Sequence, residues 1–179
     1  MTTPNLLTIS GSLRKGSFNR MLLKEAATAF GEAEVTEADL NLPLYDGDLE
    51  AGEGIPPSVQ KLADQIKAAD AIVISSPEYN KGIPGVLKNA LDWVSRVEGA
   101  VLKDKPTVVV SAAAGRTGGE TAQFMVIHCL TQLQVRLLPG PAVLVAAAMN
   151  EFAEDGSLKN DRYLETLTAR MQALRAEVS

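Results

Sequence analysis

Short apolar runs alternate with amphipathic segments along most of this 179-residue chain, and this alternation constrains its fold more than any other feature. The runs at 6–9, 71–75 and 107–110 consist almost entirely of Leu, Ile, Val, Ala and Thr. Such continuous apolar strands are typical of parallel sheets that are covered on both faces. Segment 58–69 instead repeats its apolar residues at helical spacing. Strands that alternate with helices in this way predict a doubly wound α/β fold with a parallel sheet.

The same periodicity predicts where the individual elements lie. We expect five strands, at 6–9, 34–38, 71–75, 107–110 and within 135–147, the last interrupted by Pro139, Gly140 and Pro141. We expect helices at 19–31, 58–69, 120–133 and 162–177, and another that begins near residue 84. The stretch 42–57 contains Pro and Gly, and we interpret it as irregular. Because no linker, repeat or low-complexity tract divides the sequence, we expect one domain over residues 1–179.

The loops after the first, third and fourth strands should form one site, because ligands of doubly wound sheets bind at the carboxyl ends of the strands. The first of these loops, residues 11–19, reads Gly-Ser-Leu-Arg-Lys-Gly-Ser-Phe-Asn. It joins a strand to a helix, so backbone N–H groups at the helix N-terminus favour an anion there. Its Ser and Asn side chains can donate hydrogen bonds to phosphate oxygens, and Arg14 can add positive charge.

Glycine spacing limits which phosphate ligand this first loop accepts. The dinucleotide fingerprint G-x-G-x-x-G is not present in it. Gly11 and Gly16 have the four-residue gap of a triphosphate loop, but Ser17 and Phe18 replace the lysine and hydroxyl pair that handles the β and γ phosphates. A terminal monophosphate therefore fits this loop better. The alternative is an ordinary turn in which Ser17 or Asn19 only caps the helix.

The loop at 76–85 combines two prolines, two glycines, an aromatic residue and an amide in ten residues. Proline restricts φ and glycine allows close backbone approach, so such a loop is both rigid and shaped. A planar heterocycle fits against it, with backbone groups of Glu78 and Asn80 at the ring edge and Tyr79 as a shield. The alternative is a surface loop that uses Pro and Gly as turn residues.

Composition excludes several classes of protein. With one cysteine, Cys129, and one histidine, the chain forms neither a disulfide framework nor a Cys/His metal cluster, and we expect no metal. A single cysteine also suits the reducing cytoplasm, where we place the protein. The net charge of −5 disfavours general nucleic-acid binding. No apolar run reaches the length of a membrane span and no signal-peptide pattern opens the chain, so we expect no membrane partner.

Three motifs together resemble the NAD(P)H-dependent FMN reductase family. They are the loop at 11–19, Ser-Pro-Glu-Tyr-Asn at 76–80, and Pro-Gly-Val-Leu-Lys-Asn-Ala-Leu-Asp-Trp-Val-Ser-Arg at 84–96. The resemblance extends from the first strand through the helix at 120–133. It implies a flavodoxin-like doubly wound five-stranded parallel sheet with helices on both faces, and a homodimer or homotetramer. Apolar residues 124–127 cover more than one helical face, which suits burial by the sheet and by a partner chain.

The resemblance also implies a role for each motif residue. The FMN phosphate would be held by Ser12, Arg14, Ser17, Phe18 and Asn19. The isoalloxazine ring would be lined by Pro77, Glu78, Tyr79 and Asn80, and the loop around Gly115 and Arg116 would close its other side. This last loop departs from the family pattern. Related proteins often carry serines there and an arginine soon after the Gly-Gly pair, whereas this chain has alanine at 112–114 and Glu-Thr at 120–121.

In such an enzyme the flavin carries the chemistry, and no side chain acts as a catalytic group. Hydride passes from NAD(P)H to flavin N5, and a small electron acceptor then takes it in a ping-pong scheme. The acceptors implied are quinones, free flavin, chromate and azo compounds. A flavodoxin-type electron carrier without NAD(P)H oxidation is the first alternative, although flavodoxins are usually more acidic and have a different phosphate loop. A phosphate-binding domain that uses no flavin is the second.

Overall fold

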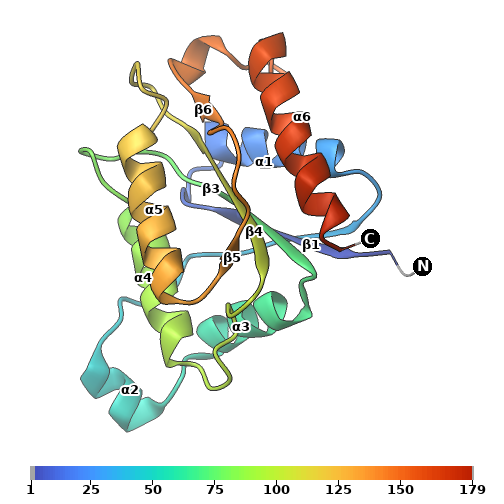
Figure 1. Ribbon diagram of the computed structural model, residues 1–179. Helices are drawn as coiled ribbons and strands as arrows, with labels where there is room; N and C mark the ends of the chain where they lie inside the picture. Colours follow the sequence, from blue (N-terminus) through green and yellow to red (C-terminus); the bar gives the residue numbers. More distant parts are fainter. Residues whose placement is uncertain (1–2, 179) are drawn as a thin grey trace.

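Parallel strands form one sheet in the computed structural model, which describes residues 3–178 (Figure 1). The strands are β1 (Asn5–Ser10), β2 (Glu34–Glu37), β3 (Ala71–Ser75), β4 (Pro106–Ala112), β5 (Arg136–Leu137) and β6 (Leu144–Val145). Their order is β2-β1-β3-β4-β5, and β6 pairs with the carboxyl-terminal end of β4. The predicted α/β class is confirmed, and the strand order reverses between β1 and β3.

Helices cover both faces of the sheet (Figure 1). One face carries α1 (Phe18–Phe30) and α6 (Asp161–Ala176), and the other carries α3 (Pro57–Ala68), α4 (Gly85–Arg96) and α5 (Glu120–Gln132). Each face has its own apolar cluster, so a strand between them is buried on both sides. All five residues of β3 are buried, which explains why the central strands are continuously apolar in the sequence.

Local sequence sets where the main helices begin. Ser17 caps α1, because its Oγ accepts a hydrogen bond from the backbone N–H of Asn19 at 3.2 Å. Asn160 caps α6 in the same way, accepting from the N–H of Arg162 at 3.1 Å. Pro57 occupies the first position of α3, where a missing N–H costs nothing. The predicted helices therefore begin within a residue or two of the observed ones.

A short helix, α2 (Gly47–Glu53), lies in the stretch that we expected to be irregular. None of its residues is buried, so hydrophobic periodicity gives no sign of it. Its Glu50 carboxylate accepts hydrogen bonds from Arg96 Nε of α4 and from the Tyr45 hydroxyl, each at 3.0 Å. A tertiary ion pair thus fastens α2 to α4, although the two are far apart in sequence.

The last predicted strand is split into β5 and β6, because Pro139 and Pro141 cannot continue a ladder of backbone hydrogen bonds. In this part of the sheet edge, side chains donate hydrogen bonds to backbone carbonyls. Gln123 Nε2 donates to the carbonyls of Val109 and Val143 at 3.2 and 3.3 Å. From the other face, the buried Arg170 guanidinium donates to the carbonyls at 138 and 139. A single 3-10 turn, Ala148–Asn150, follows β6.

The described residues also bear on membrane and metal binding. Within 3–178, no helix is both long and apolar enough to cross a membrane. Across the same residues, no three His, Cys, Asp or Glu side chains are grouped so that they could hold a metal ion.

Candidate functional site

The loops that follow β1, β3 and β4 meet at the carboxyl edge of the sheet, as predicted. The backbone N–H of Gly11 donates to the Ser75 carbonyl at 2.8 Å, and the N–H of Ser76 donates to the Val110 carbonyl at 3.0 Å. Gly11 packs so closely that a Cβ there would lie 3.1 Å from Pro77 Cδ. The first and second loops therefore touch at the point where the strand order reverses, which is where ligands of such sheets bind.

The first loop presents free backbone donors. Within the described chain, the N–H groups of Lys15, Gly16, Ser17 and Phe18 have no intramolecular acceptor. They stand at the start of α1, whose first turn contains no acidic residue to neutralise the helix dipole. Four consecutive donors at a positive helix end could hold an anion, and a phosphate group has the acceptor oxygens that such donors need.

Ser12 and Arg14 form hydrogen bonds within this loop. Ser12 is buried, and its Oγ accepts a hydrogen bond from the N–H of Arg14 at 3.3 Å. The Arg14 guanidinium donates to the Gly16 carbonyl at 2.9 Å and lies 5.9 Å from the centre of the Phe18 ring. Arg14 is exposed, so its remaining N–H groups and its charge stay available to a ligand beside the loop.

The Asn19 side chain is engaged by groups at the ends of two strands. Its side chain is buried and turned toward the sheet, where Nδ2 donates to the Ala112 carbonyl at 2.9 Å. Its Oδ1 accepts from the Ser75 hydroxyl at 2.7 Å and from the Ala112 N–H at 3.1 Å. Asn19 therefore ties the start of α1 to the ends of β3 and β4, and these bonds use its oxygen inside the protein.

The Phe18 side chain contacts the segment that follows β6. Its ring stacks on Phe152, with 5.6 Å between ring centres and 16° between ring planes. Phe152 follows the 3-10 turn near the end of the chain, so this contact holds the first loop against the segment after β6. The Phe18 ring is thus engaged by Phe152, and its backbone N–H is free for a ligand.

The second loop is a tight hairpin. Tyr79 and Gly82 exchange two backbone hydrogen bonds, of 3.0 and 3.3 Å, around Asn80 and Lys81. Asn80 and Lys81 both have positive φ, 50° and 63°, the left-handed conformation of a two-residue turn. Pro77 is buried beneath the hairpin, whereas the Tyr79 side chain is 52% exposed. The loop is thus closed by two backbone hydrogen bonds and carries an exposed aromatic residue.

The Glu78 carboxylate has a role that the sequence reasoning missed. It accepts hydrogen bonds from Lys81 Nζ at 2.9 Å and from the backbone N–H of Ala122, in the first turn of α5, at 3.2 Å. The Lys81 hydrogen bond, with smaller help from backbone N–H groups of α5, holds the pKa of Glu78 below its ordinary value. Glu78 therefore connects the hairpin to the helix that follows the third loop. In the sequence, this ion pair corresponds to a glutamate three residues before a lysine in a turn. That pattern is too common to predict the contact.

Two glycines hold the third loop in shape. Gly118 and Gly119 have φ of 63° and 89°, and a Cβ on Gly119 would lie 2.2 Å from Ser111 Oγ. The Gly115 carbonyl accepts from the N–H groups of Gly118 and Ala147, each at 3.2 Å, which fastens the loop to the segment after β6. Gly115 and Arg116 are exposed on this loop. The structure thus brings all three predicted loops to one edge.

Comparison with known proteins identifies the family. The family model of NADPH-dependent FMN reductases matches residues 4–150. The chain belongs to the NADPH-dependent FMN reductase family. It is 41% identical over 172 residues to an NAD(P)H-dependent FMN reductase of Pseudomonas aeruginosa, covering 95% of this chain and 92% of that one. It is 36% identical to a quinone reductase of Escherichia coli K12, covering 94% and 92%.

A solved structure supports the same assignment. The flavoenzyme NAD(P)H:(acceptor) oxidoreductase of Paracoccus denitrificans superposes with a TM-score of 0.87 at 30% identity, covering 98% of this chain and 97% of that one. As a member of the FMN reductase family, this chain is an oxidoreductase that uses FMN and NAD(P)H. The predictions of family, fold, enzyme class and cofactors are therefore confirmed.

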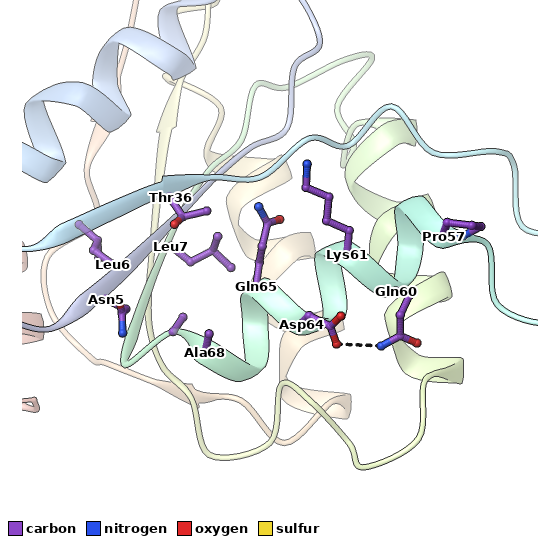
Figure 2. Close-up of a pocket in the computed structure, with 11 residues that line it drawn as sticks. Asn5, Leu6, Leu7, Thr36, Pro57, Gln60, Lys61, Asp64, Gln65 and Ala68 are labelled. Atoms are coloured by element: carbon purple, nitrogen blue, oxygen red, sulfur yellow. Dashed lines mark hydrogen bonds between the residues drawn. The ribbon is translucent and has the colours of Figure 1, made fainter.

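A separate pocket lies between α3 and the β1–β2 edge (Figure 2). Its lining includes Asn5, Thr36, Lys61 and the Gln60–Asp64 pair, joined by a 2.8 Å hydrogen bond. Asn5 begins β1, so this pocket reaches toward the amino end of the strand, away from the three loops. None of the predicted site residues of this FMN reductase lines it, and it is not the flavin site.

Proposed function

We propose that this FMN reductase reduces small acceptors such as quinones, free flavin, chromate or azo compounds. The observation that carries the proposal is the run of unpartnered N–H groups at 15–18, at the carboxyl edge of the sheet and in contact with the rigid second loop. When bound, FMN supplies the chemistry of accepting and donating hydride. The chain supplies binding, orientation and a space that both substrates can enter.

We propose that the FMN phosphate binds the N–H groups of the first loop, with Ser12, Ser17 and Arg14 as side-chain partners. The Ser17 hydroxyl accepts from Asn19 N–H and keeps its own proton for a phosphate oxygen. Phe18 contributes its N–H. Asn19 would support the site indirectly. Its side-chain oxygen accepts hydrogen bonds from Ser75 and Ala112, and these bonds hold the start of α1 against the ends of β3 and β4.

The ring of the flavin would lie on the second loop. Pro77 and the left-handed turn at Asn80 hold the backbone of Glu78 and Tyr79 in a single shape, so their N–H and carbonyl groups can meet a ring edge without reorganisation. The exposed Tyr79 ring would shield the flavin. Gly115 and Arg116 would close the opposite side, on a loop whose shape is already set by Gly118 and Gly119.

We further propose that the two substrates use this space in turn. The oxidised nicotinamide leaves before the acceptor enters, which is a ping-pong order and needs only one binding space above the ring. Side chains position the reactants and exclude water, and none serves as acid, base or nucleophile. We place this activity in one domain and in the cytoplasm, where the free thiol of Cys129 would remain reduced.

A second copy of the chain would complete the enzyme as a homodimer or homotetramer. Phe124 and Met125 on α5 are 63% and 41% exposed, and the exposed Tyr79 adds a second aromatic ring. Met125 Sδ lies 3.8 Å from where a Cβ on Gly82 would be, so this apolar surface is continuous with the second loop. Large apolar groups at a site edge are typical of a surface that a partner covers.

Purification and assay test the proposed function directly. We expect a yellow protein that binds one FMN and oxidises NAD(P)H when a quinone is present. Stopped-flow reduction by NADPH without acceptor, followed by mixing with quinone, would show two separate half-reactions. A colourless protein that takes up no FMN would overturn the proposal. Bound FMN without NAD(P)H oxidation would favour an electron carrier instead.

A further inference from the structure

Another cavity lies at the edge of the sheet where β5 ends and β6 has not yet begun, between α5 and α6 (Figure 1). Its volume is about 420 Å³, which is within the range of sites for small molecules. Its walls are mostly apolar and include Val109 of β4, Phe124 of α5 and Pro141. None of the residues that we place around the flavin lines it, so this cavity is separate from the proposed flavin site.

Arg170 of α6 brings a positive charge without a counter-ion to this cavity. Arg170 is only 7% exposed, and burial alone lowers its pKa. Its guanidinium donates to the carbonyls of Leu138 and Pro139, so two of its five N–H groups are used and three have no acceptor among residues 3–178. No carboxylate of those residues forms an ion pair with it. Because a buried charge without a counter-ion is unfavourable, an anion in the cavity would stabilise Arg170.

Gln123 of α5 adds an unused acceptor to the same cavity. The residue is 5% exposed, and both hydrogens of its amide group are donated to backbone carbonyls. Its Oε1 accepts no hydrogen bond within residues 3–178, although no completely buried side-chain oxygen of those residues is without a partner. This oxygen is therefore reached by solvent, and since Gln123 lines the cavity, it is available to a donor group there.

The segment at 139–141 positions the guanidinium. Gly140 has a φ of 146°, and a Cβ at this residue would collide with Arg170 Nη1. Pro139 and Pro141 restrict the backbone on either side of it. The charged group is thus in place before any ligand arrives, which reduces the cost of ordering the site on binding.

The three observations together specify a ligand. A guanidinium pairs with a carboxylate through parallel hydrogen bonds, the free Gln123 oxygen requires a donor, and the exposed Phe124 ring favours an aromatic neighbour. We propose that this cavity binds a small aromatic carboxylic acid that also carries a hydroxyl or amino group. The carboxylate pairs with Arg170, the donor group reaches Gln123 Oε1, and the ring lies against Phe124. This ligand site is additional to the FMN and NAD(P)H of the family.

Titration calorimetry of the FMN-loaded protein with 6-hydroxy-2-naphthoate measures binding without turnover. We expect the uncharged 6-hydroxy-2-naphthamide to bind wild type about tenfold more weakly, as for the loss of one charge-assisted pair. We expect 2-naphthoate, which lacks the donor, to bind more weakly as well. Arg170→Met should abolish the preference for the acid over the amide. Arg162→Met replaces an exposed arginine of the same helix and should retain that preference.

A second variant tests the cavity without removing Arg170, whose loss leaves two carbonyls without their donor. Ala142→Phe fills the cavity from an exposed position in its wall, so we expect it to fold as wild type does and to lose naphthoate binding. Equal affinity of wild type for the acid and the amide, or unchanged binding to Ala142→Phe, would overturn the proposal. A crystal structure in which a carboxylate of a second copy pairs with Arg170 would overturn it too.

Discussion

Asn19 at the start of α1 accepts a hydrogen bond from Ser75 at the end of β3, with 2.7 Å between Asn19 Oδ1 and Ser75 Oγ. Both residues are buried, and the same oxygen accepts from the Ala112 N–H of β4. One side chain thus joins the first loop to the two strands whose loops complete the candidate site. The position of the proposed anion site depends on this buried contact as much as on the loop itself.

Asn19→Ala is expected to destabilise the protein and weaken FMN binding together. The substitution leaves the Ala112 N–H and carbonyl and the Ser75 hydroxyl without their partner, at about 1–3 kcal/mol for each buried group that stays unpaired. Urea unfolding of the flavin-free protein and FMN titration measure the two effects. Asn41→Ala, at an exposed position, is the control. Normal FMN affinity in a destabilised Asn19→Ala protein would contradict the supporting role.

Ser17→Ala separates phosphate binding from helix capping. Loss of the cap should lower the free energy of unfolding by about 1 kcal/mol. Loss of a phosphate donor should weaken FMN while leaving riboflavin, which has no phosphate, almost unaffected. Fluorescence titration with both flavins measures the difference. Equal weakening of FMN and riboflavin would indicate that Ser17 acts only as a cap, and Ser58→Ala in α3 is the control.

The Glu78 carboxylate should contribute a pH-dependent part of the stability. Its pKa is lowered by the Lys81 hydrogen bond and then by α5 backbone donors, so its contribution is present above the unfolded-state pKa. That contribution is lost as pH falls through the lower folded-state value. Wild type should therefore be more stable than Glu78→Gln at neutral pH, and the two should converge once the pH falls below the lowered pKa of Glu78. Urea unfolding at several pH values measures this difference, and a gap that persists in acid would exclude the charge as its cause.

Arg96→Ala should loosen α2 without unfolding the domain. Arg96 is half exposed and binds Glu50, and no α2 residue is buried, so little of the core depends on this contact. We expect faster amide hydrogen exchange at residues 47–53 and almost no change in Tm. The control is Lys88→Ala, which removes a different ion pair, with Asp92, from the same helix. A large fall in Tm for Arg96→Ala would show that α2 matters to the whole fold.

Phe124→Asp tests the proposed partner surface. An aspartate there would place a charge in an interface that is otherwise apolar, and desolvating it is costly. We expect sedimentation velocity to show a smaller species than wild type, with reduced FMN retention. Leu44→Asp, at a leucine that is 81% exposed in the segment before α2, is the matched control. A wild-type monomer, or an unchanged assembly in Phe124→Asp, would contradict the placement of the interface on α5.

Periodicity and motif spacing were sufficient for most of the fold. The strand at 71–75 and the helices at 19–31 and 120–133 were predicted closely, because each buries a regular apolar pattern. α2 was missed for the opposite reason, since it buries nothing and is held by Arg96 from another helix. The split of the last strand was signalled by Pro139 and Pro141, but the buried Gln123 and Arg170 that stabilise it were not foreseen.

The sequence by itself determined the class of fold, the family and the three loops of the site, because these depend on local patterns of apolar, glycine and hydroxyl residues. Only the tertiary structure decided which atoms of those loops are free. Asn19 and Glu78 belong to binding motifs, yet their side chains are engaged by β3, β4 and α5. The backbone N–H groups at 15–18 and the Arg116 guanidinium remain available. A motif side chain that is hydrogen-bonded to a residue distant in sequence has that donor or acceptor occupied. The motif alone does not reveal such partners.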